Sequence, residues 1–239
     1  MRTVDVLAIV PHPDDAELLC GGTLAKLARE GRRTGIIDLT RGEMGTRGSV
    51  EIRTAEAARA AQVLGVTVRE NLGLPDSGLE NQPATRKLLA VVIRRLRPQM
   101  VITMAPRGRH PDHRVTAQLV RDACFLAGIR KTDPASEPHR PRKLLHAIAF
   151  REDNVKPTFV VDISADFETK LAAIACYESQ FEGVIQAGEV YPTGEPLADV
   201  IRHQSAHYGS LIRCAYGEPY WTGETMRVDD VMGLQVETF

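Results

Sequence analysis

The sequence predicts an α/β protein built on a Rossmann-like, doubly wound, mostly parallel β-sheet with helices on both faces. Two observations predict this fold class. Short apolar runs rich in Val and Ile recur along the chain, as is typical of strands covered on both faces. Segments with apolar residues at helical spacing lie between most of these runs, and this alternation indicates a parallel sheet. Handedness rules and chain order then predict the strand order 3-2-1-4-5, with an extra C-terminal strand.

The expected elements follow one another along the chain. The strands cover residues 4–10, 34–40, 67–74, 100–105, 144–150 and 158–163. Ser49 can cap an alanine-rich helix, and Pro83 suits the first turn of the next one. Gly31, Gly65 and Pro98 stand where helices are expected to end. The expected helices cover residues 23–30, 50–64, 83–96, 112 or 113 to 127, 166–177 and 201–213.

Length and charge bound the organisation of the chain and its partners. The 239 residues are expected to form one domain, with residues 1–127 as its core and residues 128–239 completing the sheet and the mouth of the site. A formal net charge of −1 gives no electrostatic argument for nucleic acid or an anionic membrane as a partner. No apolar run approaches the roughly 20 residues that span a bilayer, and the N-terminus carries no signal-peptide pattern. Four cysteines without a CxxC pair favour free thiols in a reducing compartment, so we expect a cytoplasmic protein.

Two clusters of imidazoles and carboxylates follow two of the strands. The sequence PHPDD at residues 11–15 follows the first expected strand, and HPDH at residues 110–113 follows the fourth. Strands 1 and 4 are neighbours in the predicted order, so both clusters lie at the edge where open parallel sheets bind ligands. Two His and one Asp also make the ligand count of a catalytic zinc site, with one position left for water. The pattern predicts a metal-dependent hydrolase.

The first cluster supplies two metal ligands and a base in this interpretation. Prolines on both sides of His12 stiffen the turn, and His12 and Asp15 can face one centre. Asp14 then lies beside the metal-bound water, where it is placed to act as general base while water attacks a carbonyl. The alternative is a structural turn in which Asp15 caps the following helix.

The second cluster supplies the third ligand, and spacing alone leaves open whether this is His110 or His113. We favour His113, at the start of the helix, so that His110 faces the substrate. There His110 either stabilises the oxyanion or protonates the leaving amine. Asp112 is placed to orient an imidazole from behind the ligands. The alternative is a pair of exposed histidines at a helix start.

Three further residues are expected near the same edge. Arg53 lies on the helix after the glycine-containing loop 41–48, and its guanidinium suits a carboxylate or sugar hydroxyls. A solvated helix arginine is the alternative. Glu43 and Asp76 end the second and third strands, where each can reach substrate hydroxyls or form a turn.

These residues, in this order, resemble the LmbE/PIG-L family of zinc-dependent N-acetylglucosaminyl deacetylases. The resemblance extends from the two clusters to residues 40–43, Arg53, residues 74–76 and residues 177–181. It therefore covers most of the chain.

The resemblance implies a role for each residue of the two clusters. It implies one Zn²⁺ per chain on His12, Asp15 and His113, with Fe²⁺ or another divalent metal as alternatives, and so decides between the two histidines. It also implies that Asp14 is the general base and that His110 is the electrophilic or acid partner.

The resemblance reaches beyond the clusters as well. It implies that Arg53 binds substrate and that Arg140 lines the mouth of the site. Some members use a late tyrosine to hold the oxyanion. Leu197 stands at that place here, so oxyanion stabilisation is assigned to zinc and His110, and a contribution from Tyr191 is left open. Relatives form homo-oligomers, often hexamers.

Length and pattern resemble most the branch that deacetylates N-acetylglucosaminyl-malate in bacillithiol biosynthesis. The predicted reaction is hydrolysis of an N-acetyl group on a glucosaminide, and the carboxylates of a malate aglycone would pair with Arg53 or Arg140. One alternative is another GlcNAc conjugate or a chitooligosaccharide as substrate. A second is a 2-His-1-carboxylate iron site for oxygen chemistry. A third is a non-catalytic sugar- or metal-binding module, against which Asp14 argues because binding needs no base.

Overall fold

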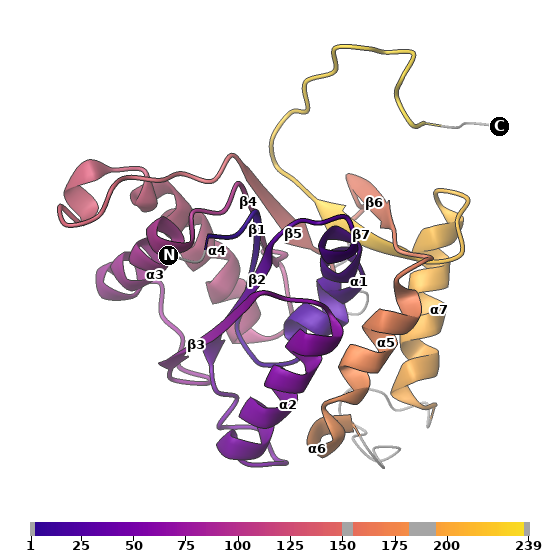
Figure 1. The fold of residues 1–239 in the computed structure, drawn as a ribbon, viewed down its shortest axis with the longest axis horizontal. Helices are drawn as coiled ribbons and strands as arrows, with labels where there is room; N and C mark the ends of the chain where they lie inside the picture. Colours follow the sequence, from indigo (N-terminus) through magenta and orange to yellow (C-terminus); the bar gives the residue numbers. More distant parts are fainter. Residues whose placement is uncertain (1–2, 150–154, 182–194, 237–239) are drawn as a thin grey trace.

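The computed structural model describes residues 3–149, 155–181 and 195–236, and in these ranges it has a single sheet in the order β3-β2-β1-β4-β5-β7-β6 (Figure 1). The strands are β1 (Val6–Val10), β2 (Thr34–Thr40), β3 (Val68–Leu74), β4 (Met100–Met104), β5 (Lys143–Ala147), β6 (Phe159–Asp162) and β7 (Gly217–Trp221). Strands β1 to β5 pair in parallel, so the predicted order 3-2-1-4-5 is confirmed. β7 pairs antiparallel with both β5 and β6.

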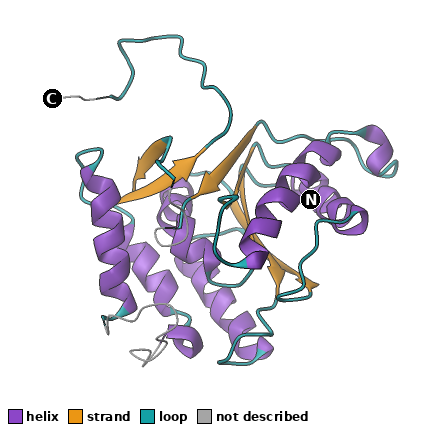
Figure 2. Ribbon diagram, turned by 180° about the vertical axis from the view of Figure 1, so that it is seen from behind, coloured by secondary structure: helices purple, strands orange, loops and turns teal. Residues whose placement is uncertain are grey.

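Helices cover both faces of the sheet, as predicted. They are α1 (Asp15–Arg29), α2 (Val50–Val63), α3 (Pro83–Leu96), α4 (Pro111–Ala127), α5 (Phe167–Ala175), α6 (Glu178–Phe181) and α7 (Leu197–Ser210), with a 3₁₀ turn, η1 (Arg130–Thr132). α3 and α4 lie on one face, α1, α2 and α5 lie on the other, and α7 packs against β7 (Figures 1 and 2). Across the described ranges, no helix has the length and apolarity needed to cross a membrane.

A separate apolar core fills each face of the sheet. Leu7 and Ile9 of β1 belong to the core under α3 and α4, whereas Val6 and Ala8 belong to the core under α1, α2 and α5. Successive side chains of a strand point to opposite faces, so a strand in the middle of the sheet must be apolar throughout. This requirement explains why β1 reads as an unbroken apolar run.

Helix α1 begins at Asp15, earlier than the predicted start at residue 23. It consists of two helical pieces joined at Cys20, whose φ of −140° and ψ of 15° are not helical. The predicted helix over residues 23–30 is therefore the second piece. The prediction missed the first piece, which presents Asp15 at its start.

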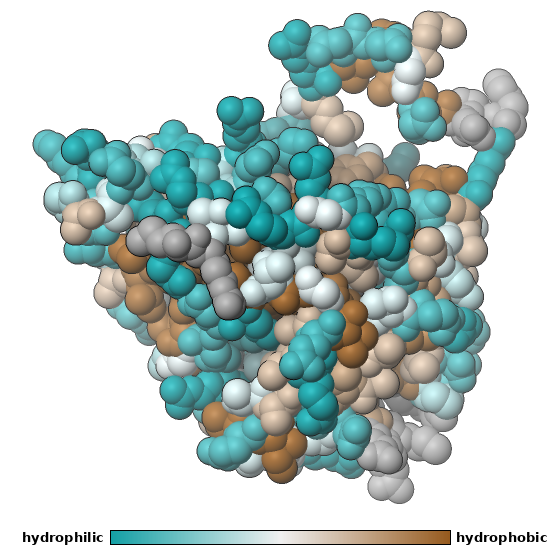
Figure 3. All heavy atoms as spheres, in the orientation of Figure 1, coloured by the Kyte–Doolittle hydropathy of each residue, from teal (hydrophilic) through white to brown (hydrophobic). Residues whose placement is uncertain are grey.

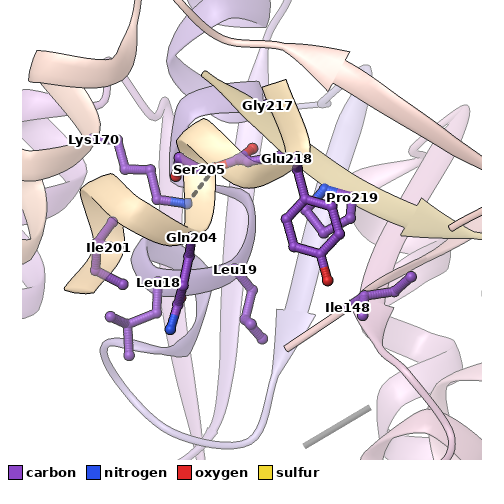
Figure 4. A pocket seen from close by; sticks show the side chains of 11 residues that line it. Leu18, Leu19, Ile148, Lys170, Ile201, Gln204, Ser205, Gly217, Glu218 and Pro219 are labelled. Carbon is purple, nitrogen blue, oxygen red and sulfur yellow. Dashed lines mark hydrogen bonds and ion pairs between the residues drawn. The ribbon is translucent and has the colours of Figure 1, made fainter. Parts of the chain in front are cut away.

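The second piece of α1 is capped by a residue from the other end of the chain. Glu218 of β7 accepts hydrogen bonds from the backbone N–H groups of Gly22 and Thr23 at 2.9 and 2.7 Å. These N–H groups have no partner within a helix that starts here, so the carboxylate satisfies them. Lys170 of α5 forms a buried ion pair with the same carboxylate at 2.6 Å, beside a small cavity (Figure 4).

The sequence did not predict β7. The strand reads GEPYW, and a charged residue and a proline interrupt any apolar run. Pro219 lacks the N–H group of a ladder hydrogen bond, which normally argues against an inner strand. The predicted fifth strand also ends earlier, at Ala147, and Phe150 lies outside the described residues.

Candidate active site

The two clusters of the sequence meet at one edge of the sheet. β1 and β4 pair directly, so the segments that follow them leave the sheet side by side. The ring centroid of His12 lies 4.9 Å from that of His110 and 5.7 Å from that of His113. The juxtaposition predicted from strand order is therefore present.

His12, Asp15 and His113 form a group of potential metal ligands. One ligand atom from each residue lies within 4.8 Å of the others. Nδ1 of His12 is 3.1 Å from Asp15 Oδ2, and Nε2 of His113 is 3.4 Å from Asp15 Oδ1. Two imidazole nitrogens and a carboxylate that face one another fit a divalent metal, because this donor set suits zinc and leaves a coordination position open.

His12 also belongs to a second, overlapping group with His110 and Asp112. In that group, His110 Nδ1 accepts the N–H of Asp112 at 3.2 Å, as the N-cap of α4. Asp112 Oδ2 accepts the N–H of Ser77 at 2.8 Å and lies 3.3 Å from His12 Nε2. These contacts tie both residues to backbone groups, and Asp15 Oδ2 likewise accepts the backbone N–H of His12 at 3.0 Å. The first group is the one that contains the three predicted ligands.

Carboxylates surround His12 on both sides of its ring. Asp15 faces Nδ1, while Asp112 and Asp76 face Nε2 at 3.3 and 3.2 Å. Burial alone would lower the pKa of His12, but hydrogen bonds to Asp112, Asp15 and Asp76 raise it to about 12. The site thus favours positive charge. A carboxylate behind a ligating imidazole is also the usual arrangement that orients a metal ligand.

Asp14 adopts a backbone conformation that L residues rarely adopt. Its φ is 108° and its ψ is −29°, and it stands at the N-cap of α1 without a side-chain capping bond. The carboxylate instead accepts a hydrogen bond from Arg53 Nη2 at 3.1 Å. Burial raises the pKa of Asp14 to about 7, although the Arg53 guanidinium opposes this shift and Asp15 adds to it. The alternative of an ordinary turn with Asp15 as the cap is wrong, because Asp15 is the first residue of the helix.

Arg53 lies near the two clusters but is enclosed by the protein. Only 5% of the residue is exposed. Besides Asp14, its guanidinium donates to the carbonyls of Pro13 at 2.7 Å and Gly42 at 2.9 Å. The expectation of a solvated helix arginine is therefore wrong. The expectation of an arginine open to substrate does not match this arrangement either, since both terminal nitrogens already have protein partners.

The tautomer of neutral His110 follows from its hydrogen bonding. Because Nδ1 accepts the Asp112 N–H, the proton of the neutral ring resides on Nε2. Burial lowers the pKa of His110, and the neighbouring His12 and His113 lower it further. His110 is half-buried. Its ring is therefore set up as a neutral hydrogen-bond donor.

Glu43 and Asp76 lie in two loops that are joined by hydrogen bonds at the edge of the sheet where the two clusters meet. The N–H of Asp76 donates to Glu43 Oε1 at 2.9 Å, and the N–H of Met44 donates to Asp76 Oδ2 at 2.9 Å. Asp76 Oδ1 faces His12, as described above. Both residues form turns, as one of the two sequence interpretations expected, and Asp76 also reaches the imidazole of His12, a potential metal ligand.

Arg140 does not lie at this edge of the chain. Its guanidinium donates to the carbonyl of Phe125 at 2.9 Å and stacks over that ring. Phe125 is twelve residues beyond His113 on α4, or about 18 Å along a helix axis. The expectation that Arg140 lines the mouth of the site is therefore wrong within one chain. Tyr191 lies outside the described residues.

The sequence did not lead us to predict a network of buried charged residues that lies behind the site. Arg69 donates to the two oxygens of Asp38 at 2.8 and 2.9 Å and to Glu17 at 2.5 Å. Tyr177 donates to the same oxygen of Glu17 at 3.2 Å, and Glu17 lies one turn after Asp14. Charged residues inside strands that are covered on both faces, such as Asp38, need a buried partner. That signal was present in the sequence.

Known proteins share both the sequence and the fold of this chain. The model of the PIG-L family, described as GlcNAc-PI de-N-acetylase, matches residues 7–124. A diacetylchitobiose deacetylase of Thermococcus kodakarensis is 33% identical over 89% of this chain and 80% of its own. A probable N-acetyl-alpha-D-glucosaminyl L-malate deacetylase 2 of Bacillus cereus is 28% identical over 76% of this chain and 86% of its own. The solved structure of a conserved protein from Thermus thermophilus is 39% identical and superposes with a TM-score of 0.84, covering 95% of this chain and 98% of that one.

Proposed function

Because the chain belongs to the PIG-L family, we propose that His12, Asp15 and His113 hold one zinc ion and that the site hydrolyses the N-acetyl group of a small GlcNAc conjugate. The chain is a deacetylase of GlcNAc-containing substrates, an enzyme that hydrolyses an N-acetyl amide bond. One observation carries the proposal for the site. Asp14 directly precedes Asp15 of the three converging ligand residues, and its side chain makes no cap hydrogen bond but accepts one from Arg53.

The metal and Asp14 would divide the chemistry between them. When bound, zinc supplies Lewis-acid chemistry, which lowers the pKa of water toward ~7 and polarises the acetyl carbonyl. Asp14 accepts a proton as water attacks the carbonyl carbon, and it returns that proton to the amine nitrogen as the C–N bond breaks. The hydrogen bond from Arg53 fixes the direction of the carboxylate during this transfer.

His110 serves this reaction as a hydrogen-bond donor. Its neutral ring carries the proton on Nε2, because Nδ1 is occupied by the N–H of Asp112. The Nε2–H group of His110 can donate to the negative oxygen that develops on the acetyl carbonyl. Of the two roles that the sequence left open, this geometry supports oxyanion stabilisation.

For the substrate, we propose two candidates, of which the first is N-acetylglucosaminyl-malate and the second is diacetylchitobiose. The similarity to the Bacillus cereus malate deacetylase supports the first candidate. The higher identity with the Thermococcus kodakarensis enzyme, over a larger share of the chain, supports the second. The expected pairing of Arg53 or Arg140 with the malate carboxylates gives no support to the first candidate. Arg53 is enclosed by the protein, and Arg140 lies at the far end of α4.

Acetate release decides between these candidates. The zinc-loaded protein would be incubated with N-acetylglucosaminyl-malate, diacetylchitobiose and free N-acetylglucosamine, with the Asp14→Asn variant beside it. The substrate with the highest kcat/KM identifies the class, provided that Asp14→Asn abolishes its turnover. No release from any of the three, with metal bound, contradicts the proposed function.

The identity of the metal needs its own measurement. Two His and one carboxylate also bind iron in oxygen-dependent enzymes. Metal analysis after anaerobic purification, followed by activity after reconstitution with Zn²⁺ or Fe²⁺, separates the two. Activity with Fe²⁺ alone contradicts the zinc assignment but leaves the ligand set in place.

A further inference from the structure

The first piece of α1, residues 15–19, is too short to hold its own position. It is little more than one helical turn, and the non-helical Cys20 separates it from the rest of the helix. An isolated turn is unstable in water, because its formation fixes several residues for a single hydrogen bond. Asp14, the residue before this turn, also has a strained backbone. Contacts with the rest of the protein must therefore fix the turn that presents Asp14 and Asp15.

Glu17 makes such contacts on the buried side of the turn. Its Oε1 accepts hydrogen bonds from Arg69 Nη1 at 2.5 Å and from the hydroxyl of Tyr177 at 3.2 Å. Hydrophilic side chains are spread over the face of the molecule in Figure 3, where charged groups are normally hydrated. Glu17 and Tyr177, by contrast, are both 0% exposed. Their hydrogen bond resists breakage, because water cannot readily replace either partner.

Arg69 is held in turn by two other elements. Its Nε and Nη2 donate to the two oxygens of Asp38 on β2 at 2.8 and 2.9 Å, and this paired arrangement fixes the plane of the guanidinium. Its Nη1 also donates to the carbonyl of Ala57 at 3.1 Å, on α2 and about one turn after Arg53. A single guanidinium thus joins the turn that presents Asp14 to the helix that presents Arg53.

This connection controls the pairing of Asp14 with Arg53. Arg53 Nη2 donates both to the Asp14 carboxylate at 3.1 Å and to the carbonyl of Pro13 at 2.7 Å. Both bonds run from α2 to the segment that starts α1, and a relative displacement of about 1 Å would break them. Arg69 therefore fixes the two backbones relative to each other, and Arg53 then fixes the carboxylate.

We propose that Arg69 and Tyr177 are positioning residues for deacetylation, which hold Asp14 against Arg53 through their hydrogen bonds to Glu17. The proposal rests on the assignment of Asp14 as the general base. Both residues act through Glu17, so their loss should slow the chemical step and leave substrate binding unchanged.

Conservative substitutions of the two residues test this role in the zinc-saturated protein. Tyr177→Phe removes one hydroxyl and keeps the shape of the ring, and we expect kcat to fall about 3- to 10-fold while KM changes by less than about threefold. Arg69→Lys keeps the charge but cannot bind Asp38 through two nitrogens, and we expect a fall of about 10- to 100-fold. The substrate is the one that the wild type turns over with the highest kcat/KM.

Tyr220→Phe is the matched control. It also removes a buried hydroxyl that faces a buried carboxylate, that of Glu218 at 3.4 Å, but this pair contacts the second piece of α1. We expect the kcat of this variant to equal that of the wild type. Melting temperatures of Tyr177→Phe and Tyr220→Phe would show whether the two changes affect stability to a similar extent. Equal losses of kcat in the two variants would overturn the proposal.

Combination with Arg53→Lys separates positioning from a general effect on the fold. Arg53→Lys already releases Asp14, so adding Tyr177→Phe should lower kcat by less than about twofold. The same fold-loss in the wild-type and Arg53→Lys backgrounds would overturn the proposal, as would a wild-type kcat in Tyr177→Phe. Asp14→Asn is measured in parallel. If it loses activity and Tyr177→Phe does not, only the positioning role fails, whereas a wild-type kcat in Asp14→Asn contradicts the base assignment and the positioning role together.

Discussion

At the scale of single residues, the site depends on the backbone of Asp14. A φ of 108° is unfavourable for any residue with a Cβ atom, and such strain costs about 1–3 kcal/mol. Arg53 offsets it by binding both the carbonyl of Pro13 and the carboxylate of Asp14. The strained turn places the Asp15 carboxylate toward His12 and His113, the other proposed metal ligands, and the Asp14 carboxylate toward Arg53. A relaxed turn would give neither residue its observed partners.

Replacing Asp14 by Asn tests its role as the base. Asn retains the shape of the side chain and tolerates positive φ, but it cannot accept a proton at neutral pH. We expect kcat to fall by about 10²- to 10⁴-fold, with the zinc content per chain unchanged. Steady-state acetate release and metal analysis measure the two quantities. A kcat within tenfold of wild type would mean that another group takes the proton.

Replacing Arg53 by Lys tests whether it positions Asp14 or binds substrate. Lys cannot contact Gly42, Pro13 and Asp14 at once, so we expect kcat to fall by at least tenfold while KM changes by less than threefold. Arg59→Lys, on the exposed face of the same helix, is the control and should match wild type. A rise in KM with unchanged kcat would return Arg53 to substrate binding, as the sequence suggested.

Gly42 is required by the position of Arg53. A Cβ atom on Gly42 would lie 1.9 Å from Arg53 Nη1, and the φ of Gly42 is +68°. We therefore expect Gly42→Ala to displace the guanidinium and to lower kcat as Arg53→Lys does. Gly31→Ala, also at positive φ but with no atom within 4 Å of the added Cβ, controls for backbone strain. Equal loss of activity in both variants would argue against the contact.

At the scale of elements, α1 is held in two pieces by Glu218. The carboxylate caps the second piece and pairs with Lys170, and both partners are almost fully buried. The second piece could be predicted because Leu24 and Leu27 are at helical spacing before Gly31. The first could not, since Cys20-Gly21-Gly22 reads as a break and the capping carboxylate lies 196 residues away.

Glu218→Ala tests this cap. It leaves the Lys170 ammonium and two N–H groups buried without their partner, so we expect a loss of about 3–5 kcal/mol in the free energy of unfolding. Glu70→Ala removes a more exposed partner, that of Arg95, and should cost less than about 1 kcal/mol. Urea denaturation measures both. Similar losses in the two variants would show that the buried carboxylate has no special role.

At the scale of the whole molecule, the proposed metal joins two distant parts of the chain. Its ligands come from the turn after β1 and from the start of α4. A ligand that binds only the folded state stabilises it by mass action, by about 4 kcal/mol at a free concentration 1,000-fold above the dissociation constant. We expect a chelator to lower the melting temperature and zinc to restore it. Asp15→Asn should abolish this shift, and a zinc-dependent shift that persists in Asp15→Asn would contradict the ligand set.

The sequence by itself determined the sheet order and the meeting of the two clusters. Apolar runs, glycine and proline stops and the handedness of βαβ units are local or topological, so one chain suffices to recognise them. Only the tertiary structure showed that Arg53 is enclosed by protein groups and that Arg140 lies far from the candidate active site. It alone showed that α1 consists of two helical pieces and that β7 lies between β5 and β6 in the sheet. Each of these depends on contacts between residues far apart in the chain, such as the 39 positions between Asp14 and Arg53. Such contacts exist only once the packed elements fix which side chains face each other.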